Sequence, residues 1–436
     1  MNFKKDLPLT SSHWGTYRAK VKDGKIKELI GWENDKDPSP IGQGIVDVHN
    51  HQTRIDSPMI RKSWMDKGPG SNNSLRGTDP FISISWDEAE KIVSNEASYN
   101  LVRKMRASFW VLAPLILRYG EAKVSLPGGC AIGTRPINFY LSILESMGTT
   151  IKLKDGYVLA SIKNQLKPIN FKLNFPSVGV THFFLMMASL VEGKSVIKNA
   201  AKEPEVIFLA NMLNKMGAKI SGHGTNKITV IGNSNLKGVK IAAPPDRIEA
   251  GTFALAVSAT GGKLKLNSIN INEIYSLISI LKNSGVKIIP SNNSLEIIKN
   301  DKIITPIDIR TMPYPGFPTD LQAQFMALMS YAKGKSRIKE TIFENRFMHV
   351  QELVRLGANI KLKGDTALID GVDKLYGAPL MATDLRASAS LIIAALRAEG
   401  TSTIRRVYHL DRGFDKIENK LSSCGAIIER KRDKDE

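Results

Sequence analysis

The sequence predicts an α/β protein assembled from a repeat of about 70 residues, and two recurring phrases support that prediction. The first phrase ends a helical segment with a glycine and continues into a short apolar strand. Its five glycines are Gly148, Gly217, Gly285, Gly357 and Gly425. The second phrase is a glycine followed by a strand, and it recurs in step with the first. Its five glycines are Gly120, Gly193, Gly262, Gly334 and Gly400. Each repeat is therefore predicted as helix, glycine turn, strand, second helix, glycine and strand.

The helical segments of these repeats are apolar enough to form a core. Phe183–Val191, Phe253–Val257 and Leu391–Leu396 consist almost entirely of apolar residues, which is typical of helices buried on all sides. Five such repeats fit between Met105 and the C-terminus. Since a chain of 436 residues is too long for a single core, the sequence indicates two or three domains.

The composition is that of a soluble globular protein, with 42% hydrophobic and 24% charged residues. The apolar run Phe109–Leu117 is far too short to span a membrane, and the N-terminal residues lack the apolar stretch of a signal peptide. The two cysteines, Cys130 and Cys424, provide no disulfide framework. We therefore predict a cytoplasmic protein without a membrane segment.

The net charge of +19 lies entirely after residue 96, because residues 1–96 contain equal numbers of basic and acidic side chains. Such an excess fits nucleic acid, an acidic surface or small anionic substrates. No basic run with interleaved aromatic residues occurs, so small anions are favoured over nucleic acid. A basic nucleic-acid-binding module remains the alternative that rests on charge alone.

Residues 1–96 differ in character from the rest of the chain. They hold four of the five tryptophans and a strand-like run at Gly15–Val21, with turn signals between such runs. His49 and His51 have the spacing of a metal-binding pair, but no third ligand accompanies them, so we predict no metal site.

Four phrases in this segment carry a resemblance. They are Ser12-His-Trp-Gly15, Asp37-Pro-Ser-Pro40, Arg61-Lys-Ser-Trp64 and Trp86-Asp-Glu-Ala89. The segment is similar to the N-terminal end of molybdopterin-dependent oxidoreductases of the biotin sulfoxide and dimethyl sulfoxide reductase type. The pterin-binding domains and metal-ligand loop of those enzymes do not follow, so we predict no molybdenum chemistry.

The loop Leu126–Pro136, with the sequence LPGGCAIGTRP, is the strongest candidate for chemistry. Three glycines surround Cys130 and let the backbone approach a ligand closely. Arg135 has a planar fork suited to phosphate or carboxylate, and its charge favours a thiolate nearby. On these residues alone, a glycine turn with a bystander cysteine is an equally good interpretation.

This loop resembles the catalytic loop of the UDP-N-acetylglucosamine 1-carboxyvinyltransferases, enolpyruvyl transferases of the EPSP synthase superfamily. The resemblance covers residues 97–434 and includes the phrases PYPGFPTDLQAQF, ETIFENRFMHV, TDLRASASL and YHLDRGFDKIENKL. It implies a two-domain inside-out α/β barrel of six repeats, three in each domain. Here the first repeat is missing and an unrelated fragment takes its place. The implied domains are 1–96, 97–244 and 245–436.

The resemblance also implies the activity. Members of the family transfer the enolpyruvyl group of phosphoenolpyruvate to the 3-hydroxyl of UDP-N-acetylglucosamine and release phosphate, the first committed step of peptidoglycan synthesis. No metal or organic cofactor is implied. Cys130 would be the general acid that adds covalently to phosphoenolpyruvate and that fosfomycin alkylates. Asp320 would be the general base, and Arg412 the third catalytic residue.

The resemblance assigns further residues to the two substrates. Those implied to bind phosphoenolpyruvate are Arg135, Arg346, Asp384, Arg386 and Arg412. Those implied to bind UDP-N-acetylglucosamine are Arg106, Arg135, Pro136, Ile137, Asn138, Phe139, Ser177, Val178, Gly179, Asp320 and Ile342.

The chain departs from the family pattern in two places. The family's Ser-Gly-Ala-Lys-Asn phrase, whose lysine contacts phosphoenolpyruvate, is absent from the sequence. Asn138 and Tyr140 stand where the family usually has aspartate and histidine. A catalytically impaired chimera is therefore the alternative to an active enzyme. The sequence gives no indication of the oligomeric state.

Overall fold

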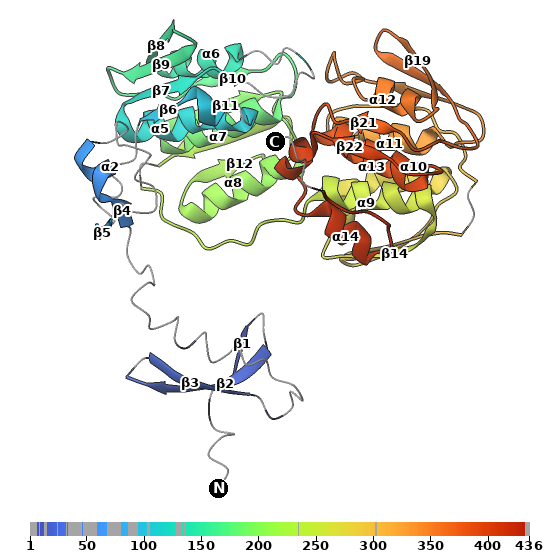
Figure 1. Cartoon of the computed structure of the whole chain (residues 1–436). Helices are drawn as coiled ribbons and strands as arrows, with labels where there is room; N and C mark the ends of the chain where they lie inside the picture. The colour runs from blue at the N-terminus through green and yellow to red at the C-terminus, as the bar shows by residue number, and fades with distance from the viewer. Residues whose placement is uncertain are drawn as a thin grey trace. The chain divides into compact units, whose positions relative to one another are not determined.

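The computed structural model describes most of the chain after residue 94 and shorter stretches before it (Figure 1). The described residues are 7, 9–12, 15–23, 25–31, 33, 46, 59–67, 80–85, 95–102, 105–127, 133, 137–233, 235–300 and 303–431. They divide into two compact units, Met1–Ser94 and Asn95–Glu436.

The first unit contains a three-stranded antiparallel sheet in the order β1-β2-β3 and a separate antiparallel pair, β4-β5. One short helix, α2, lies between β4 and β5 in the sequence. The elements of the unit are β1 (Leu9–Ser12), β2 (Gly15–Lys22), β3 (Lys25–Gly31), β4 (Met59–Arg61), α2 (Lys62–Lys67) and β5 (Phe81–Ser83). Strand β2 coincides with the strand-like run predicted at Gly15–Val21. Tyr17, Ala19, Leu29 and Val46 form its small apolar cluster, and Arg18 binds both carboxylate oxygens of Glu33.

The second unit begins with two four-stranded sheets and the helices that pack on them (Figure 1). The elements of the first sheet and its helices are β6 (Glu96–Ala97), α4 (Tyr99–Val102), η3 (Arg106–Val111), α5 (Leu112–Tyr119), β7 (Glu121–Ser125), α6 (Asn138–Met147), β8 (Thr149–Lys154) and β9 (Tyr157–Ile162). Those of the second are β10 (Asn170–Lys172), α7 (Val178–Leu190), β11 (Gly193–Lys198), α8 (Pro204–Met216), β12 (Lys219–Ser221) and β13 (Lys227–Gly232). Helices α5 and α7 pack against each other within one hydrophobic core.

The remainder of the second unit has a core of its own, built around three helices that pack on one another, α9, α11 and α13 (Figure 1). Its elements as far as α11 are α9 (Arg247–Thr260), β14 (Gly262–Asn267), η4 (Ile271–Ile274), α10 (Tyr275–Asn283), β15 (Lys287–Ser291), β16 (Ser294–Lys299), β17 (Ile309–Arg310), η5 (Thr319–Leu321) and α11 (Gln322–Met329). Those after it are β18 (Lys335–Lys339), α12 (Val350–Arg355), β19 (Asn359–Lys363), β20 (Thr366–Asp370), β21 (Pro379–Met381), α13 (Leu385–Arg397), β22 (Thr403–Arg405), η6 (Val407–Arg412) and α14 (Ile417–Ser423).

Three sheets of the second unit share one strand order. Their orders are β6-β7-β9-β8, β10-β11-β13-β12 and β17-β18-β20-β19. In each sheet a short first strand pairs parallel to the second, and the remaining pairs are antiparallel. The other two sheets, β14-β16-β15 and β21-β22, are smaller.

The glycines of the two phrases lie where the predicted order of helix, glycine and strand requires them. Gly148, for example, has a φ of +104° and ends α6 directly before β8, a conformation that favours glycine. Gly217 does the same between α8 and β12 with a φ of +113°. One expectation was wrong: after Gly425 the described residues 426–431 form no strand. Among the residues that the structure describes, no helix has the length and apolarity to cross a membrane.

Candidate active site

The loop that carries Cys130 falls mostly outside the described residues, as do Arg135 and Pro136 within it. Its two ends are placed. The backbone N–H of Leu126 donates to the carbonyl of Gly156 at 2.8 Å, directly after β7, and α6 begins at Asn138. Gly133 lies so close to Glu344 that a methyl group in place of its hydrogen would clash with a carboxylate oxygen of that side chain. Gly133 therefore lies beside the segment that carries Arg346.

Asp320 is the centre of the described site. It lies in the 3₁₀ turn η5, immediately before α11, and its carboxylate accepts hydrogen bonds from two arginines. Arg346 Nη2 donates to Oδ1 at 2.7 Å, and Arg386 Nη2 donates to Oδ2 at 3.2 Å. The sequence resemblance named all three residues, and the structure brings them into direct contact.

The charge state of Asp320 follows from these contacts. Its side chain keeps 39% of its surface exposed, whereas the side chains of Arg346 and Arg386 are 4% and 15% exposed. Burial alone raises the pKa of Asp320, but the charges and hydrogen bonds of Arg386 and Arg346 outweigh burial and hold the pKa well below its ordinary value. Asp320 is thus a carboxylate throughout the neutral range.

Arg386 is fixed by the start of α13. Asp384 caps this helix, and its Oδ1 accepts hydrogen bonds from the backbone N–H groups of Arg386 at 2.9 Å and Ala387 at 3.1 Å. The guanidinium of Arg386 lies over the ring of Phe414, 5.8 Å from its centroid. Its Nη1 is buried and has no hydrogen-bond partner in the part of the chain that the structure describes. Asp384 therefore orients the Arg386 guanidinium, whose buried Nη1 is available to donate a hydrogen bond to an anion.

Arg346 is held differently, in the turn before α12. Its guanidinium lies 5.3 Å from the centroid of the Phe343 ring. The nearby His349 is buried, and the sequence reasoning did not single it out although it belongs to the phrase ETIFENRFMHV. Burial lowers the pKa of His349 to about 4; the charge of Arg346 adds to this effect, and Asp384 opposes it. The histidine is therefore neutral beside the two charged groups.

His349 makes stability depend on pH in a direction that can be stated. In the unfolded chain the histidine has its ordinary pKa of about 6.5, so the unfolded state binds a proton that the folded state refuses until about pH 4. Stability is therefore lost as the pH falls through this window. At pH 5 the loss amounts to about 2 kcal/mol. We expect His349→Gln to remove this part of the decrease, as measured by urea unfolding at pH 7 and pH 5. An equal decrease in wild type and variant would contradict the assignment.

Arg412 lies at the end of η6, which packs against α13. Gly413, the next residue, has no room for a side chain, since an added Cβ would lie 2.8 Å from Leu385 at the start of α13. Arg412 is half-buried and lines a hollow together with Glu249, Lys416 and Arg430. Among the ion pairs of the described residues, those of Asp320 are with Arg346 and Arg386, and the clamp role of Arg412 stays a prediction.

The residues implied to contact the nucleotide sugar lie at the starts of three helical elements, η3, α6 and α7. Arg106 begins η3, Ile137 to Phe139 begin α6, and Ser177 caps α7 by accepting a long hydrogen bond from the Val180 N–H at 3.5 Å. Aromatic contacts join these starts. Phe139 packs edge to face on Phe175, with ring centroids 5.6 Å apart.

Tyr140 of α6 lies directly against Gly179 of α7. A Cβ at Gly179 would lie 2.4 Å from the Tyr140 hydroxyl and 3.3 Å from Trp110 Nε1, so only glycine fits there. The Tyr140 ring is buried, edge to face with Phe183 at 5.2 Å. Tyr140, one of the two departures from the family pattern, thus contributes to the core. Ile342 lies in the other part of the unit, half-buried, and its N–H donates to Glu340.

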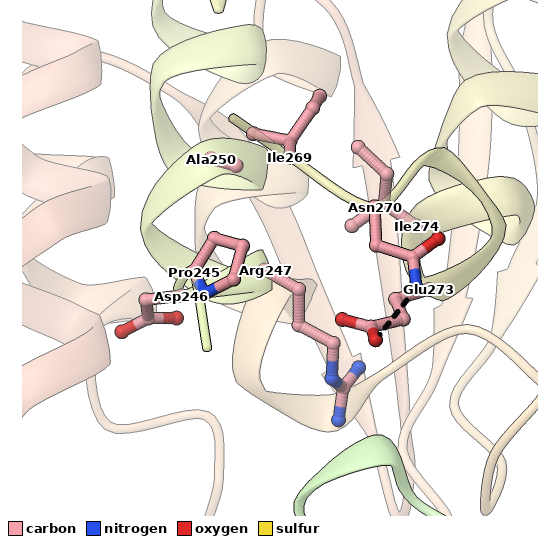
Figure 2. Close-up of a pocket in the computed structure, with 8 residues that line it drawn as sticks. All are labelled: Pro245, Asp246, Arg247, Ala250, Ile269, Asn270, Glu273 and Ile274. Atoms are coloured by element: carbon pink, nitrogen blue, oxygen red, sulfur yellow. Dashed lines mark hydrogen bonds between the residues drawn. The ribbon is translucent and has the colours of Figure 1, made fainter. Parts of the chain in front are cut away.

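A small hollow lies beside Arg247 and Glu273 (Figure 2). Asn270 donates a hydrogen bond to Glu273 at 2.9 Å there. Arg247 forms a paired contact with Glu205 at the start of α8, with Nε donating at 2.9 Å and Nη2 at 3.3 Å. Burial disfavours the charge of Arg247, but Glu205 outweighs burial and raises the pKa of the guanidinium. This pair connects the two helix-rich cores of the second unit.

We expect Glu205→Gln to reduce the free energy of unfolding by about 1 kcal/mol, because the arginine loses its charged partner while water screens the half-exposed pair. Urea denaturation measures the change. Glu399→Gln, which breaks an exposed pair with Lys374, is the matched control and should cost less. Equal losses in both variants would show that the Arg247–Glu205 pair contributes no more to stability than an exposed ion pair does.

Comparison with known proteins identifies the family of this chain. The family model described as EPSP synthase (3-phosphoshikimate 1-carboxyvinyltransferase) matches residues 84–421. A UDP-N-acetylglucosamine 1-carboxyvinyltransferase from Chelativorans sp. (strain BNC1) is 56% identical over 342 residues, which cover 78% of this chain and 80% of that protein. One from Xanthobacter autotrophicus is 54% identical over 361 residues, 83% of this chain and 84% of that protein. The chain belongs to the UDP-N-acetylglucosamine 1-carboxyvinyltransferase family.

Solved structures show the same mixed α/β fold as this family member. The enolpyruvyl transferase NikO from Streptomyces tendae superposes with a TM-score of 0.69 at 24% identity, covering 80% of this chain and 82% of its own. EPSP synthase from Acinetobacter baumannii gives a TM-score of 0.58 at 20% identity, covering 75% and 79%. At these identities the likeness concerns the fold alone.

The second resemblance is also confirmed. The family model described as molybdopterin oxidoreductase N-terminal domain matches residues 10–48. His49 and His51 lie outside the described residues. Within the described residues, no group of three or more histidine, cysteine, aspartate or glutamate side chains is arranged to hold a metal ion.

Proposed function

We propose that this chain transfers the enolpyruvyl group of phosphoenolpyruvate to the 3-hydroxyl of UDP-N-acetylglucosamine and releases phosphate. The observation that carries the proposal is the Asp320 carboxylate held between Arg346 and Arg386 in a member of this family. A carboxylate can accept the hydroxyl proton as the oxygen attacks the enol carbon, and arginine forks suit the phosphate and carboxylate of phosphoenolpyruvate. Cys130 would donate the proton that the methylene carbon gains on addition, and loss of a proton from the resulting methyl group as phosphate departs would restore the double bond.

The arginine pair also explains why Asp320 is a poor base until substrate binds. Both guanidiniums stabilise its charge in the free protein. An entering phosphate or carboxylate competes for the same donors, above all the unused Nη1 of Arg386. Anion binding therefore weakens the hold on Asp320 and raises its basicity where the hydroxyl must be deprotonated. Arg135 and Arg412 would complete the anion clamp.

The nucleotide sugar would lie along the starts of η3, α6 and α7 and reach Ile342 and Asp320. Support comes from the convergence of these starts through aromatic contacts and from the free N–H groups of helix N-termini, which favour the negative diphosphate. The residues proposed for this site are Arg106, Arg135, Pro136, Ile137, Asn138, Phe139, Ser177, Val178, Gly179, Asp320 and Ile342.

The architecture we propose is the two-domain inside-out barrel without its first repeat, with domains at 97–244 and 245–436. The shared order of three sheets supports a repeat. Three helices, α9, α11 and α13, all pack on one another in one core, whereas in the described part of the other core α7 packs on α5, α6 and α8. A missing repeat accounts for that difference. The proposed location is the cytoplasm, and the proposed partners are the two small substrates.

A specific observation favours a second candidate, a catalytically impaired chimera. The Ser-Gly-Ala-Lys-Asn phrase is absent, and residues 10–48 match an unrelated family. Loss of a charged contact in a closed phosphate site commonly costs on the order of 3 kcal/mol of transition-state binding, about a hundredfold in rate. The chimera would bind the nucleotide sugar weakly and turn over slowly, or it would show no binding and no turnover at all.

Phosphate release from phosphoenolpyruvate by the purified chain separates the two candidates. The active enzyme releases phosphate only when UDP-N-acetylglucosamine is present, and fosfomycin blocks the release by alkylating Cys130. Mass spectrometry of the Cys130→Ser variant, which should take up no fosfomycin, verifies the site of alkylation. A folded protein that releases no phosphate under these conditions would overturn the proposal and favour the chimera.

A further inference from the structure

Glu340 is a buried carboxylate, 4% exposed, that follows β18 directly. All four of its described hydrogen bonds come from uncharged donors. Oε1 accepts from Thr311 Oγ1 at 2.8 Å and from the backbone N–H groups of Ile342 at 2.8 Å and Phe343 at 3.2 Å. Oε2 accepts from Thr319 Oγ1 at 2.9 Å. A buried charge needs such a set of donors, and bonds to a charged acceptor are stronger than neutral ones.

These four donors belong to segments that are separate in the sequence. Thr311 follows β17, Thr319 begins η5, and Ile342 with Phe343 lies in the turn after β18. Thr311 strengthens the link, since its hydroxyl accepts from the Thr341 N–H at 2.9 Å and its carbonyl accepts from Thr341 Oγ1 at 2.6 Å. One carboxylate therefore fixes the η5 turn and the 341–343 turn against each other.

Each fixed turn carries a group of the proposed site. Thr319 is the neighbour of Asp320. On the other side, Phe343 supports the Arg346 guanidinium, and Glu344 lies against Gly133 of the cysteine loop. The ion pair between Asp320 and Arg346 also joins the η5 turn to the segment that follows the 341–343 turn. The geometry of base, arginine and loop thus depends on Glu340, which touches none of the reacting groups.

We propose that Glu340 is a positioning residue, which sets the Asp320 base and the Ile342–Arg346 segment in register for enolpyruvyl transfer. The inference rests on the proposed function and adds to it a residue that holds both substrate subsites together. Because its donors are two hydroxyls and two backbone N–H groups, only an acceptor with two oxygens satisfies them all. Glutamine offers one oxygen and places an NH₂ group against a donor.

The test compares a substitution that disturbs both turns with one that disturbs only the η5 turn. Glu340→Gln disturbs both, so we expect kcat to fall about thirtyfold and the Kd for UDP-N-acetylglucosamine to rise about tenfold, as expected for displaced contacts in a closed site. Thr319→Val removes only the bond to the η5 turn and keeps the buried charge. It should lower kcat about tenfold and leave that Kd within about twofold. Steady-state phosphate release and calorimetric titration give the two quantities.

Asp308→Asn is the matched control. Asp308 precedes β17 and accepts hydrogen bonds at 2.7 Å from the Arg337 N–H and at 2.8 Å from Arg337 Nε, so it joins the start of β17 to β18, on the N-terminal side of Thr311 and Glu340. Its substitution should leave kcat and Kd unchanged. Thermal unfolding of all variants identifies any loss caused by unfolding, and Thr319→Val decides the question if Glu340→Gln does not fold.

The outcomes are distinct. An active wild type with a Glu340→Gln variant of equal kcat and Kd, or an Asp308→Asn variant that loses as much, would overturn the role of Glu340 and leave the proposed function standing. A wild type that neither binds UDP-N-acetylglucosamine nor releases phosphate overturns both. A loss of kcat with retained Kd in Thr319→Val, beside the double loss in Glu340→Gln, supports the proposal.

Discussion

Replacing Asp320 by asparagine is expected to lower kcat for phosphate release at least about a hundredfold, the usual contribution of a general base. The amide keeps the size and one hydrogen-bond acceptor of the side chain, but it cannot take a proton from the sugar hydroxyl. Arg346 and Arg386 remain in place and lose the only carboxylate they are seen to share in the described structure. Their charge then becomes fully available to an anionic substrate.

The Michaelis constants should separate loss of chemistry from loss of binding. We expect the KM for phosphoenolpyruvate to stay the same or to fall, because the anion no longer competes with Asp320 for the arginines. The control is Asp365→Asn, which removes an exposed carboxylate paired with Lys339 and should leave both constants unchanged. A decrease in kcat of less than about fivefold would show that another group takes the proton.

The local structure around the recurring glycines could be predicted because glycine and apolar residues act over short distances. Gly148 and Gly217 follow helices that cannot continue past a positive φ, and the apolar residues after them fall on strands. Gly425 follows the same rule at its helix, yet residues 426–431 do not form a strand. Strand formation needs a neighbouring strand with free backbone groups, and the local pattern carries no information about that neighbour.

The sequence named candidate residues for the site but not the contacts between them. Family phrases named Asp320, Arg346 and Arg386, but nothing in those phrases says that two arginines from different turns share one carboxylate. Glu340 went unnoticed because its function depends on four donors from three segments. Tyr140 stands where the family usually has histidine, and no local pattern shows that its ring packs against Phe183. In each of these cases the contact joins residues that are far apart in the sequence, and local patterns do not reveal such contacts.

Replacing Arg346 by methionine is expected to lower kcat/KM for phosphoenolpyruvate about a hundredfold, since one buried cation of the anion clamp is lost. The side chain is 4% exposed, so the methionine fills its space and the turn before α12 keeps its shape. Arg346→Lys retains the charge as a single point without the planar contact to Phe343, and it should recover only part of the loss. Steady-state phosphate release with varied phosphoenolpyruvate measures both variants.

Arg355→Met is the matched control, because Arg355 lies in α12 close to Arg346 in sequence, is exposed, and donates only to the carbonyl of Pro379 among its described hydrogen bonds. Its kcat/KM should equal that of wild type. Unchanged kcat/KM in Arg346→Met would show that the arginine serves Asp320 alone. The two substitutions then have opposite signatures: Asp320→Asn lowers kcat and spares the KM for phosphoenolpyruvate, whereas Arg346→Met raises that KM. Both signatures are required if Asp320 is the base and Arg346 binds the anion that displaces it.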